Sequence, residues 1–177
     1  MNMFFTADTH FDHKNVIKYC NRPFSSIQEM NQALIDKWNS KVKPGDLVFH
    51  LGDFAFGHDI LKFTEVLNGD IILIKGNHDD KNIYRSNGFL KVHELLDTKI
   101  NDTYITLCHF SMRVWEKSHF DSWHCFGHSH GSLEPFGKSR DVGVDNNNFE
   151  PIEFEELKKI MNDRPSNFNA IKSRYVN

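Results

Sequence analysis

Residues 70–79 have the sequence DIILIKGNHD, which joins a strand signal to a group of polar side chains. The run from Ile71 to Ile74 is continuously aliphatic, which is typical of a strand buried on both faces, as in a parallel sheet. The run leads directly into Gly76-Asn77-His78-Asp79. Glycine permits a sharp turn at that point, so the polar residues are expected at the end of a buried strand.

The same order, an apolar run followed by polar residues, occurs twice earlier in the chain. Residues 2–7 predict a strand that ends at Asp8-Thr9-His10, and residues 47–51 predict one that ends at Gly52-Asp53. Between these strands, apolar residues recur at helical spacing in 25–42 and again in 60–67. Strands that alternate with helices predict an α/β domain with parallel pairing.

After about residue 92 the pattern changes, because strand signals follow one another with little helix between them. Such signals occur at 99–100, 103–108, 123–126 and 142–144. They favour a second sheet with antiparallel pairing. We expect one domain over residues 1–162, closed by a helix, and a polar tail over 163–177.

Seven side chains that could bind metal ions follow the predicted strands. Asp8 and His10 are two residues apart, so both side chains of an extended segment point to the same side. A mixture of carboxylates, a carboxamide and imidazoles suits Mn, Fe or Zn. Seven side chains exceed the need of one tetrahedral ion and suit two ions about 3.5–4 Å apart that share a carboxylate. The set is Asp8, His10, Asp53, Asn77, His109, His128 and His130.

The series D-x-H, G-D, G-N-H-D, a single His and G-H-x-H, in this order between Asp8 and His130, resembles the calcineurin-like metallophosphoesterases. The resemblance implies a four-layer α/β/β/α sandwich of two mixed sheets flanked by helices. It also implies a hydrolase that cleaves phosphate esters with two divalent ions and a metal-bridging hydroxide as nucleophile.

The resemblance also divides the seven side chains between two ions. It implies that one ion is bound by Asp8, His10 and His130. The other ion is then bound by Asn77, His109 and His128, and Asp53 bridges both. Manganese is the favoured metal, with Fe, Zn, Ni and Mg as alternatives.

His78 follows a ligand but does not match a ligand position of the family. The resemblance makes it the histidine that contacts the phosphate and protonates the leaving oxygen, a task for which imidazole is suited. We expect Asp79 to accept the other N–H of that ring. We also expect substrate contacts from His13, Arg22 and Arg113.

Composition limits the remaining possibilities. The chain has 177 residues, 39% hydrophobic and 25% charged, which is typical of a globular domain. It has neither an apolar run of about 18 residues nor a signal-peptide pattern. Three cysteines without a C-x-x-C pair favour reduced thiols. We expect a cytoplasmic protein with no membrane partner, as a monomer or small homo-oligomer.

The expected substrate is a small phosphate ester or a nucleotide, cleaved by a phosphodiesterase or a nucleotide-directed phosphatase. The alternative is a nuclease that acts on short single strands of nucleic acid. Such an enzyme needs a basic, aromatic groove, for which Arg22, Lys81, Arg85 and Arg113 would have to converge. The net charge of −3 gives no general attraction to nucleic acid. A non-catalytic metal-binding scaffold is a further alternative, against which the complete ligand set weighs.

Overall fold

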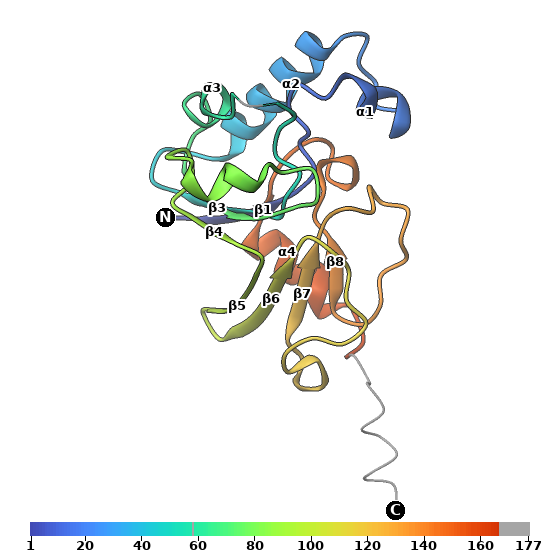
Figure 1. Ribbon diagram of the computed structural model, residues 1–177. Coiled ribbons are helices and arrows are strands. Elements are labelled where there is room, and N and C mark those ends of the chain that lie inside the picture. Colours follow the sequence, from blue (N-terminus) through green and yellow to red (C-terminus); the bar gives the residue numbers. More distant parts are fainter. Residues whose placement is uncertain (58, 167–177) are drawn as a thin grey trace, which may run out of the picture.

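The computed structural model describes residues 1–57 and 59–166, in which two mixed sheets pack against each other, with the first sheet above the second in the view of Figure 1. The first sheet has the strand order β4-β3-β2-β1-β9, in which β1 to β4 are parallel and β9 is antiparallel to β1. Its strands span Met3–Thr6 (β1), Leu47–His50 (β2), Asp70–Ile74 (β3), Lys91–His93 (β4) and Ile152–Glu153 (β9). The parallel α/β pattern predicted for the first half of the chain is confirmed.

The second sheet has the order β5-β6-β7-β8. Its strands span Leu95–Ile100 (β5), Thr103–Cys108 (β6), Trp123–Phe126 (β7) and Ser139–Asp141 (β8). Only β5 and β6 are antiparallel, whereas β6, β7 and β8 are parallel to one another. The expectation of antiparallel pairing is therefore wrong for two of the three pairs. The long connections between these strands return the chain to the same end of the sheet without a full helix.

Helices α1 (Lys14–Tyr19), α2 (Ile27–Lys41) and α3 (Leu61–Thr64) gather on one side of the first sheet, as Figure 1 shows. The Ser26 side chain accepts a hydrogen bond from the Glu29 N–H, so α2 begins at the predicted cap. Helix α4 (Phe154–Asn162) contacts β1 and β9. The described residues also form three short 3-10 helices: η1 (Lys81–Arg85), η2 (Ser118–Phe120) and η3 (Val144–Asn146).

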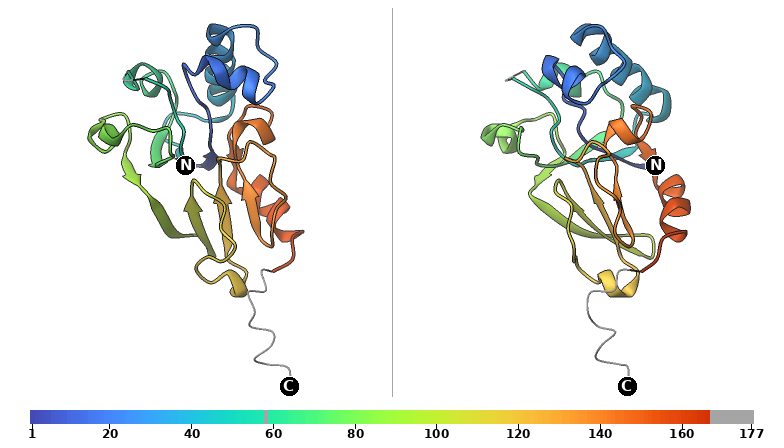
Figure 2. Two further views of the ribbon diagram at one scale, coloured as in Figure 1. Left: turned by 45° about the vertical axis from the view of Figure 1, so that its right-hand side comes forward. Right: turned by 90° about the vertical axis from the view of Figure 1, so that its right-hand side faces the viewer.

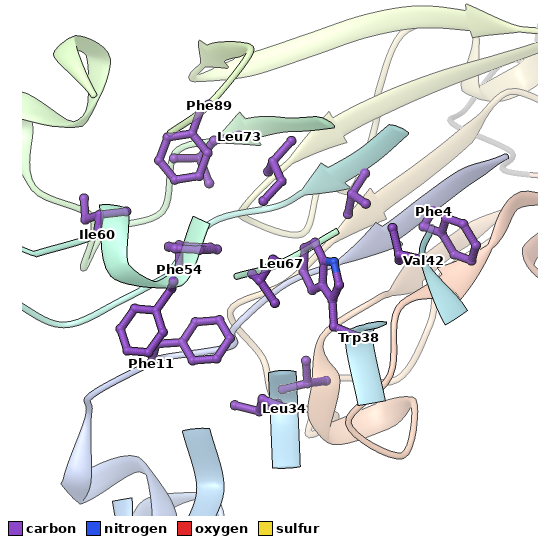
Figure 3. Packing of buried hydrophobic residues seen from close by; sticks show 14 of the residues in the cluster. Phe4, Phe11, Leu34, Trp38, Val42, Phe54, Ile60, Leu67, Leu73 and Phe89 are labelled. Atoms are coloured by element: carbon purple, nitrogen blue, oxygen red, sulfur yellow. The ribbon is translucent and has the colours of Figure 1, made fainter. Parts of the chain in front are cut away.

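Successive side chains of the first sheet point to opposite faces, so two separate hydrophobic cores form, one on each side of it. Phe4 of β1 faces the helices and joins a core that includes Phe11, Trp38 and Phe54 (Figure 3). The next residue, Phe5, faces the other way, into a core between the two sheets that also holds residues of α4. Successive strand residues point to opposite faces, so the first sheet is buried on both sides.

The outer face of the second sheet is covered by a loop segment. His124 of β7 stacks on Phe126 and lies tilted against Trp115, whose ring comes from the connection between β6 and β7. Two mixed sheets with flanking helices confirm the predicted fold class, and two turned views show the same arrangement (Figure 2).

The two sheets meet at the ends of their parallel strands. Ala7, just after β1, forms an isolated parallel bridge with Gly143, which follows β8. The loops after β1, β2, β3, β6 and β7 therefore open toward one region. Helix α4 ends at Asn162, and residues 167–177 of the predicted tail lie outside the described part, so the domain boundary stays a prediction. No helix in the described ranges has the length and apolar character to cross a membrane.

Candidate metal centre

All seven predicted ligand residues lie in the loops that follow the parallel strands. Asp8 and His10 follow β1, Asp53 follows β2 and Asn77 follows β3. His109 follows β6, and the segment with His128 and His130 follows β7. The first sheet therefore supplies four of these side chains and the second sheet supplies three.

Five of the seven residues have a left-handed backbone, with φ between 45° and 67°. Residues with a Cβ rarely adopt this conformation, although Asp, Asn and His do so more readily than others. Backbone bonds fix it here, since the Asp8 N–H donates to Gly52 O and the His10 N–H donates to Asp53 O, each at 3.0 Å. Non-glycine residues held in this strained backbone conformation are characteristic of functional sites, where the conformation directs several side chains to one point. The five residues are Asp8, His10, Asp53, His128 and His130.

Asp53 occupies the middle of the cluster. Its Oδ2 lies 3.5 Å from Nε2 of His10 and 3.5 Å from Nε2 of His109. The two histidines come from different sheets, so this one carboxylate oxygen stands between the two groups.

The ligand-type atoms form two groups that share this region. Asp8, His10 and His130 each offer an atom within 4.8 Å of the others. A second group with the same spacing consists of Asp53, His109 and His128. Oδ1 of Asn77 lies 3.0 Å from Nε2 of His109, which places it beside the second group.

Several histidine rings are oriented so that the ring nitrogen without a hydrogen-bond donor role points into the cluster. Nδ1 of His109 donates to Leu51 O at 2.7 Å, so in the neutral ring Nε2 carries a lone pair toward Asn77 and Asp53. Nδ1 of His130 donates to Oδ2 of Asp145 at 2.7 Å in the same way. Within the described residues, the buried Nε2 of His10 has no hydrogen-bond partner.

These electron-pair donors fit divalent cations. Asp8 is completely buried, and burial together with the nearby Asp141 charge raises the pKa of its carboxyl group well above the usual value. Burial and the neighbouring His130 lower the pKa of His10 to about 2. A bound metal ion would offset the charge of the buried Asp8 carboxylate. It would also accept the lone pair of the neutral His10 ring.

Arg22 has a different place from the predicted one. Its side chain is fully buried, and it pairs with Asp145 through Nε at 2.8 Å and through a terminal nitrogen at 2.9 Å. It also donates to Asp8 O at 2.6 Å and Thr9 O at 3.0 Å. The predicted substrate contact of Arg22 is therefore wrong, because the guanidinium group holds the strained loop after β1 in place.

Asp145 was missed by the sequence interpretation. Burial acts to raise its pKa, but the hydrogen bonds from His130 and Arg22 outweigh this effect and lower it. The carboxylate thus links the loop after β1 to the ring of a ligand. A sequence signal was present, since Asp145 directly follows the strand signal at 142–144 and stands two residues after Gly143, the position in which the other polar residues of the site occur.

Asp79 also has a structural rather than a catalytic position. Its carboxylate accepts N–H groups of Asp53 at 2.9 Å, Phe54 at 2.9 Å and Gly76 at 2.8 Å. These bonds tie the loop after β2 to the loop after β3. The expectation that Asp79 orients the ring of His78 is therefore wrong, because its oxygens are directed to the backbone.

Two glycines allow the loops to approach the carboxylates. A Cβ atom at Gly76 would lie 2.2 Å from Oδ1 of Asp53, and one at Gly127 would lie 2.8 Å from Oδ2 of Asp8. Both distances are too short for a side chain. These positions therefore require glycine for space.

His78 and His13 line a cavity of about 830 Å³ beside His10. The His78 ring is exposed and its centroid lies 5.6 Å from that of His10, whereas its backbone N–H donates to Oδ1 of Asp53 at 2.9 Å. His13 stacks on Phe56 with centroids 4.7 Å apart. Both positions are compatible with the substrate contacts expected for them.

Arg113 lies apart from this cavity. Its guanidinium group stands over the Phe136 ring, 4.4 Å from the centroid. Arg113 is exposed and is not among the residues that line the cavity. The substrate contact predicted for it has no support from this position.

Comparison with known proteins relates the whole described domain to others. The model of the calcineurin-like phosphoesterase superfamily domain matches residues 1–140. An uncharacterised protein of Methanocaldococcus jannaschii is 34% identical in an alignment of 176 positions that covers 90% of this chain and 90% of that one. A protein of unknown function from Aquifex aeolicus has a similar structure, with a TM-score of 0.71, 22% identity and coverage of 90% of this chain and 98% of that one.

Proposed function

This chain belongs to the calcineurin-like phosphoesterase superfamily, and we propose that it is a phosphodiesterase or nucleotide-directed phosphatase that uses two divalent ions, preferably manganese. The family is one of metal-dependent phosphoesterases, and the donor set described above suits such ions. The observation that carries the proposal is the position of Asp53, whose Oδ2 lies 3.5 Å from a histidine of each group.

Within this proposal, one group of residues binds each ion. Asp8, His10 and His130 would hold the first, Asn77, His109 and His128 would hold the second, and Asp53 would bridge them. When bound, two such ions polarise the phosphoryl group and supply an activated water.

The chain's own residues then position and protonate the substrate. His78 reaches the cavity from the loop after β3, and its backbone bond to Asp53 keeps it beside the centre. We assign to its ring the transfer of a proton to the leaving oxygen. We assign to His13 a contact with the ester from the α1 side, which its stacking on Phe56 and its position in the cavity lining support.

The cavity gives no support to the nuclease alternative. None of Arg22, Lys81, Arg85 and Arg113 lines it, and Arg85 lines a separate depression beside Ile60. A single strand of nucleic acid needs a continuous basic groove. We therefore favour small esters over polymers as substrates.

A substrate panel tests the proposed function. The metal-free protein is supplied with Mn, Ni, Mg or Zn and assayed on bis-p-nitrophenyl phosphate, p-nitrophenyl phosphate, cyclic nucleotides, dinucleotides and oligonucleotides. We expect hydrolysis of small esters that depends on added metal. Absence of hydrolysis with every metal would refute the proposal, and faster cleavage of oligonucleotides would favour the nuclease.

Two variants show whether the activity comes from this centre. Asp53→Asn removes the shared anion and should lose both bound metal and turnover. Asp102→Asn makes the same change in the exposed turn between β5 and β6 and should keep both. Equal activity of the two variants would place the reaction elsewhere.

A further inference from the structure

The cavity beside His10 has a wall that the metal centre does not use. Helix α1 and the residue after it contribute Val16, Tyr19 and Cys20, and Leu133 lines the same space from the loop after β7. Tyr19 is 73% exposed and Leu133 is 48% exposed. A volume of about 830 Å³ is within the range of roughly 300–1,000 Å³ that small-molecule sites occupy.

This wall carries no fixed charge. Within the described part of the chain, no Lys, Arg, Asp or Glu lines the cavity. The carboxylate of Asp145 lies behind the wall, with an atom within 4.8 Å of the Cys20 thiol, and it is already paired with Arg22. The polar atoms on the wall are neutral as well, since they belong to Asn21, Ser129 and Ser132.

A neutral wall discriminates between classes of phosphate ester. A phosphodiester has one negative charge, which the centre itself can compensate, whereas a nucleoside polyphosphate or a substrate with a second phosphate has further charges. On entering the cavity, those additional charges would lose their hydration and find no cation on the wall to pair with. The lost hydration would make binding less favourable. An uncharged planar group gains by burying its faces against an aromatic ring and an aliphatic side chain.

We infer that this cavity binds the uncharged, nucleoside-sized substituent of a monoanionic phosphodiester, between Tyr19 and Leu133. This specificity rests on the proposed phosphoesterase function and adds to it the class of substrate. Asn21, Ser129 and Ser132 offer hydrogen bonds to the edge of the bound group. Substrates with a second phosphate on that group are excluded.

Two substrates with the same charge and the same leaving group test the inference. Thymidine 5′-p-nitrophenyl phosphate and methyl p-nitrophenyl phosphate differ only in the group that the cavity should bind. We expect the nucleoside ester to have the lower KM. Tyr19→Ser and Leu133→Ser should each raise that KM roughly tenfold, which is typical for loss of a stacking contact, and leave the KM of the methyl ester unchanged.

Matched variants on other surfaces serve as controls. Tyr84→Ser and Leu95→Ser remove side chains that are 48% and 42% exposed and do not line the cavity. Both should keep the wild-type KM for both esters. Leu133→Lys adds a cation to the wall and should lower the KM for thymidine 3′-phosphate 5′-p-nitrophenyl phosphate, the ester with a second phosphate.

Binding of thymidine alone separates this inference from the proposed function. Saturation-transfer NMR should detect thymidine on the wild-type chain and lose the signal with Tyr19→Ser. If the methyl ester is hydrolysed with metal but the nucleoside gives neither a lower KM nor a binding signal, the inference is wrong and the phosphoesterase function stands. If neither ester is hydrolysed, the proposed function fails and the substrate class fails with it.

Discussion

His78 differs from its neighbours because its backbone and its ring have separate partners. The backbone N–H is fixed on Asp53 at 2.9 Å, whereas the exposed ring faces the cavity. Asn77, one residue earlier, is directed toward His109 instead. One turn after β3 thus directs the Asn77 amide toward His109 and presents the His78 ring to the cavity, as the proposed roles of ligand and proton donor require.

This position leads to a prediction about leaving groups. A nitrophenolate departs with little protonation, whereas a ribose hydroxyl needs a proton in the transition state. His78→Ala should therefore lower turnover on nucleotide esters by roughly 10²–10⁴ and lower it much less on nitrophenyl esters. Metal content of the same preparations should remain at the wild-type level. Equal losses on both kinds of substrate would assign His78 to phosphate binding rather than to proton transfer.

Asp145 provides a second prediction at this scale. Asp145→Asn removes the anion that orients His130 and pairs with Arg22, so one ion should bind more weakly by about 10–100-fold. The other ion depends on His109 and should keep its affinity. Calorimetric titration with Mn²⁺, with Asp102→Asn as the control for an exposed carboxylate, measures both sites. Unchanged affinity at both sites would mean that Asp145 does not support a ligand.

The residues differ in how far the sequence could predict them. The ligands follow strands and stand beside glycines, so their places could be predicted from the motifs. Arg22 and Asp145 are 123 positions apart, and nothing local indicates that they form a pair. Asp79 was assigned to the ring of His78 by adjacency, whereas its oxygens meet backbone N–H groups of two loops.

At the scale of elements, β7 contains a histidine that is buried away from the centre. Nδ1 of His124 donates to Thr106 O at 3.0 Å, and Nε2 accepts the Met112 N–H at 3.0 Å. Only the neutral ring can form both bonds, since a protonated Nε2 would meet another N–H. Burial is the main cause that lowers the pKa of His124.

This arrangement predicts how stability depends on pH. The unfolded chain binds a proton at His124 near pH 6.5, whereas the folded chain does so only at lower pH, so stability falls as the pH falls between these values. The slope for one histidine is at most about 1.4 kcal/mol per pH unit. Between pH 7 and 5, the wild-type free energy of unfolding should therefore fall more steeply than that of His124→Gln. Urea unfolding with chelator checks this, and parallel curves would contradict it.

The elements of the first sheet were easier to predict than those of the second. Helical spacing in 25–42 and three apolar runs specify β1, β2, β3 and α2, because each element buries a regular stripe. In the second sheet the parallel partners β6, β7 and β8 are joined by connections without a full helix. Whether two of these strands pair parallel or antiparallel then depends on the path of the long loop between them. Loops have no periodic pattern in the sequence from which that path could be predicted.

At the scale of the whole molecule, the centre joins the two sheets. Four of the proposed ligands come from the first sheet and three from the second, and Asp53 stands between histidines of both. Cations bound there would hold the sheets together and stabilise the folded chain by mass action. The cavity proposed for the substrate group is lined by α1 and by the loop after β7, which also come from opposite sides of this junction.

In the function proposed here, one carboxylate, Asp53, bridges two ions between the sheets. An anomalous-scattering map of crystals grown with Mn²⁺ tests it directly. We predict two peaks about 3.5–4 Å apart, one beside Asp8 and His10, the other beside Asn77 and His109, with Asp53 in contact with both. A single peak, or two peaks of which one does not contact Asp53, would contradict the account.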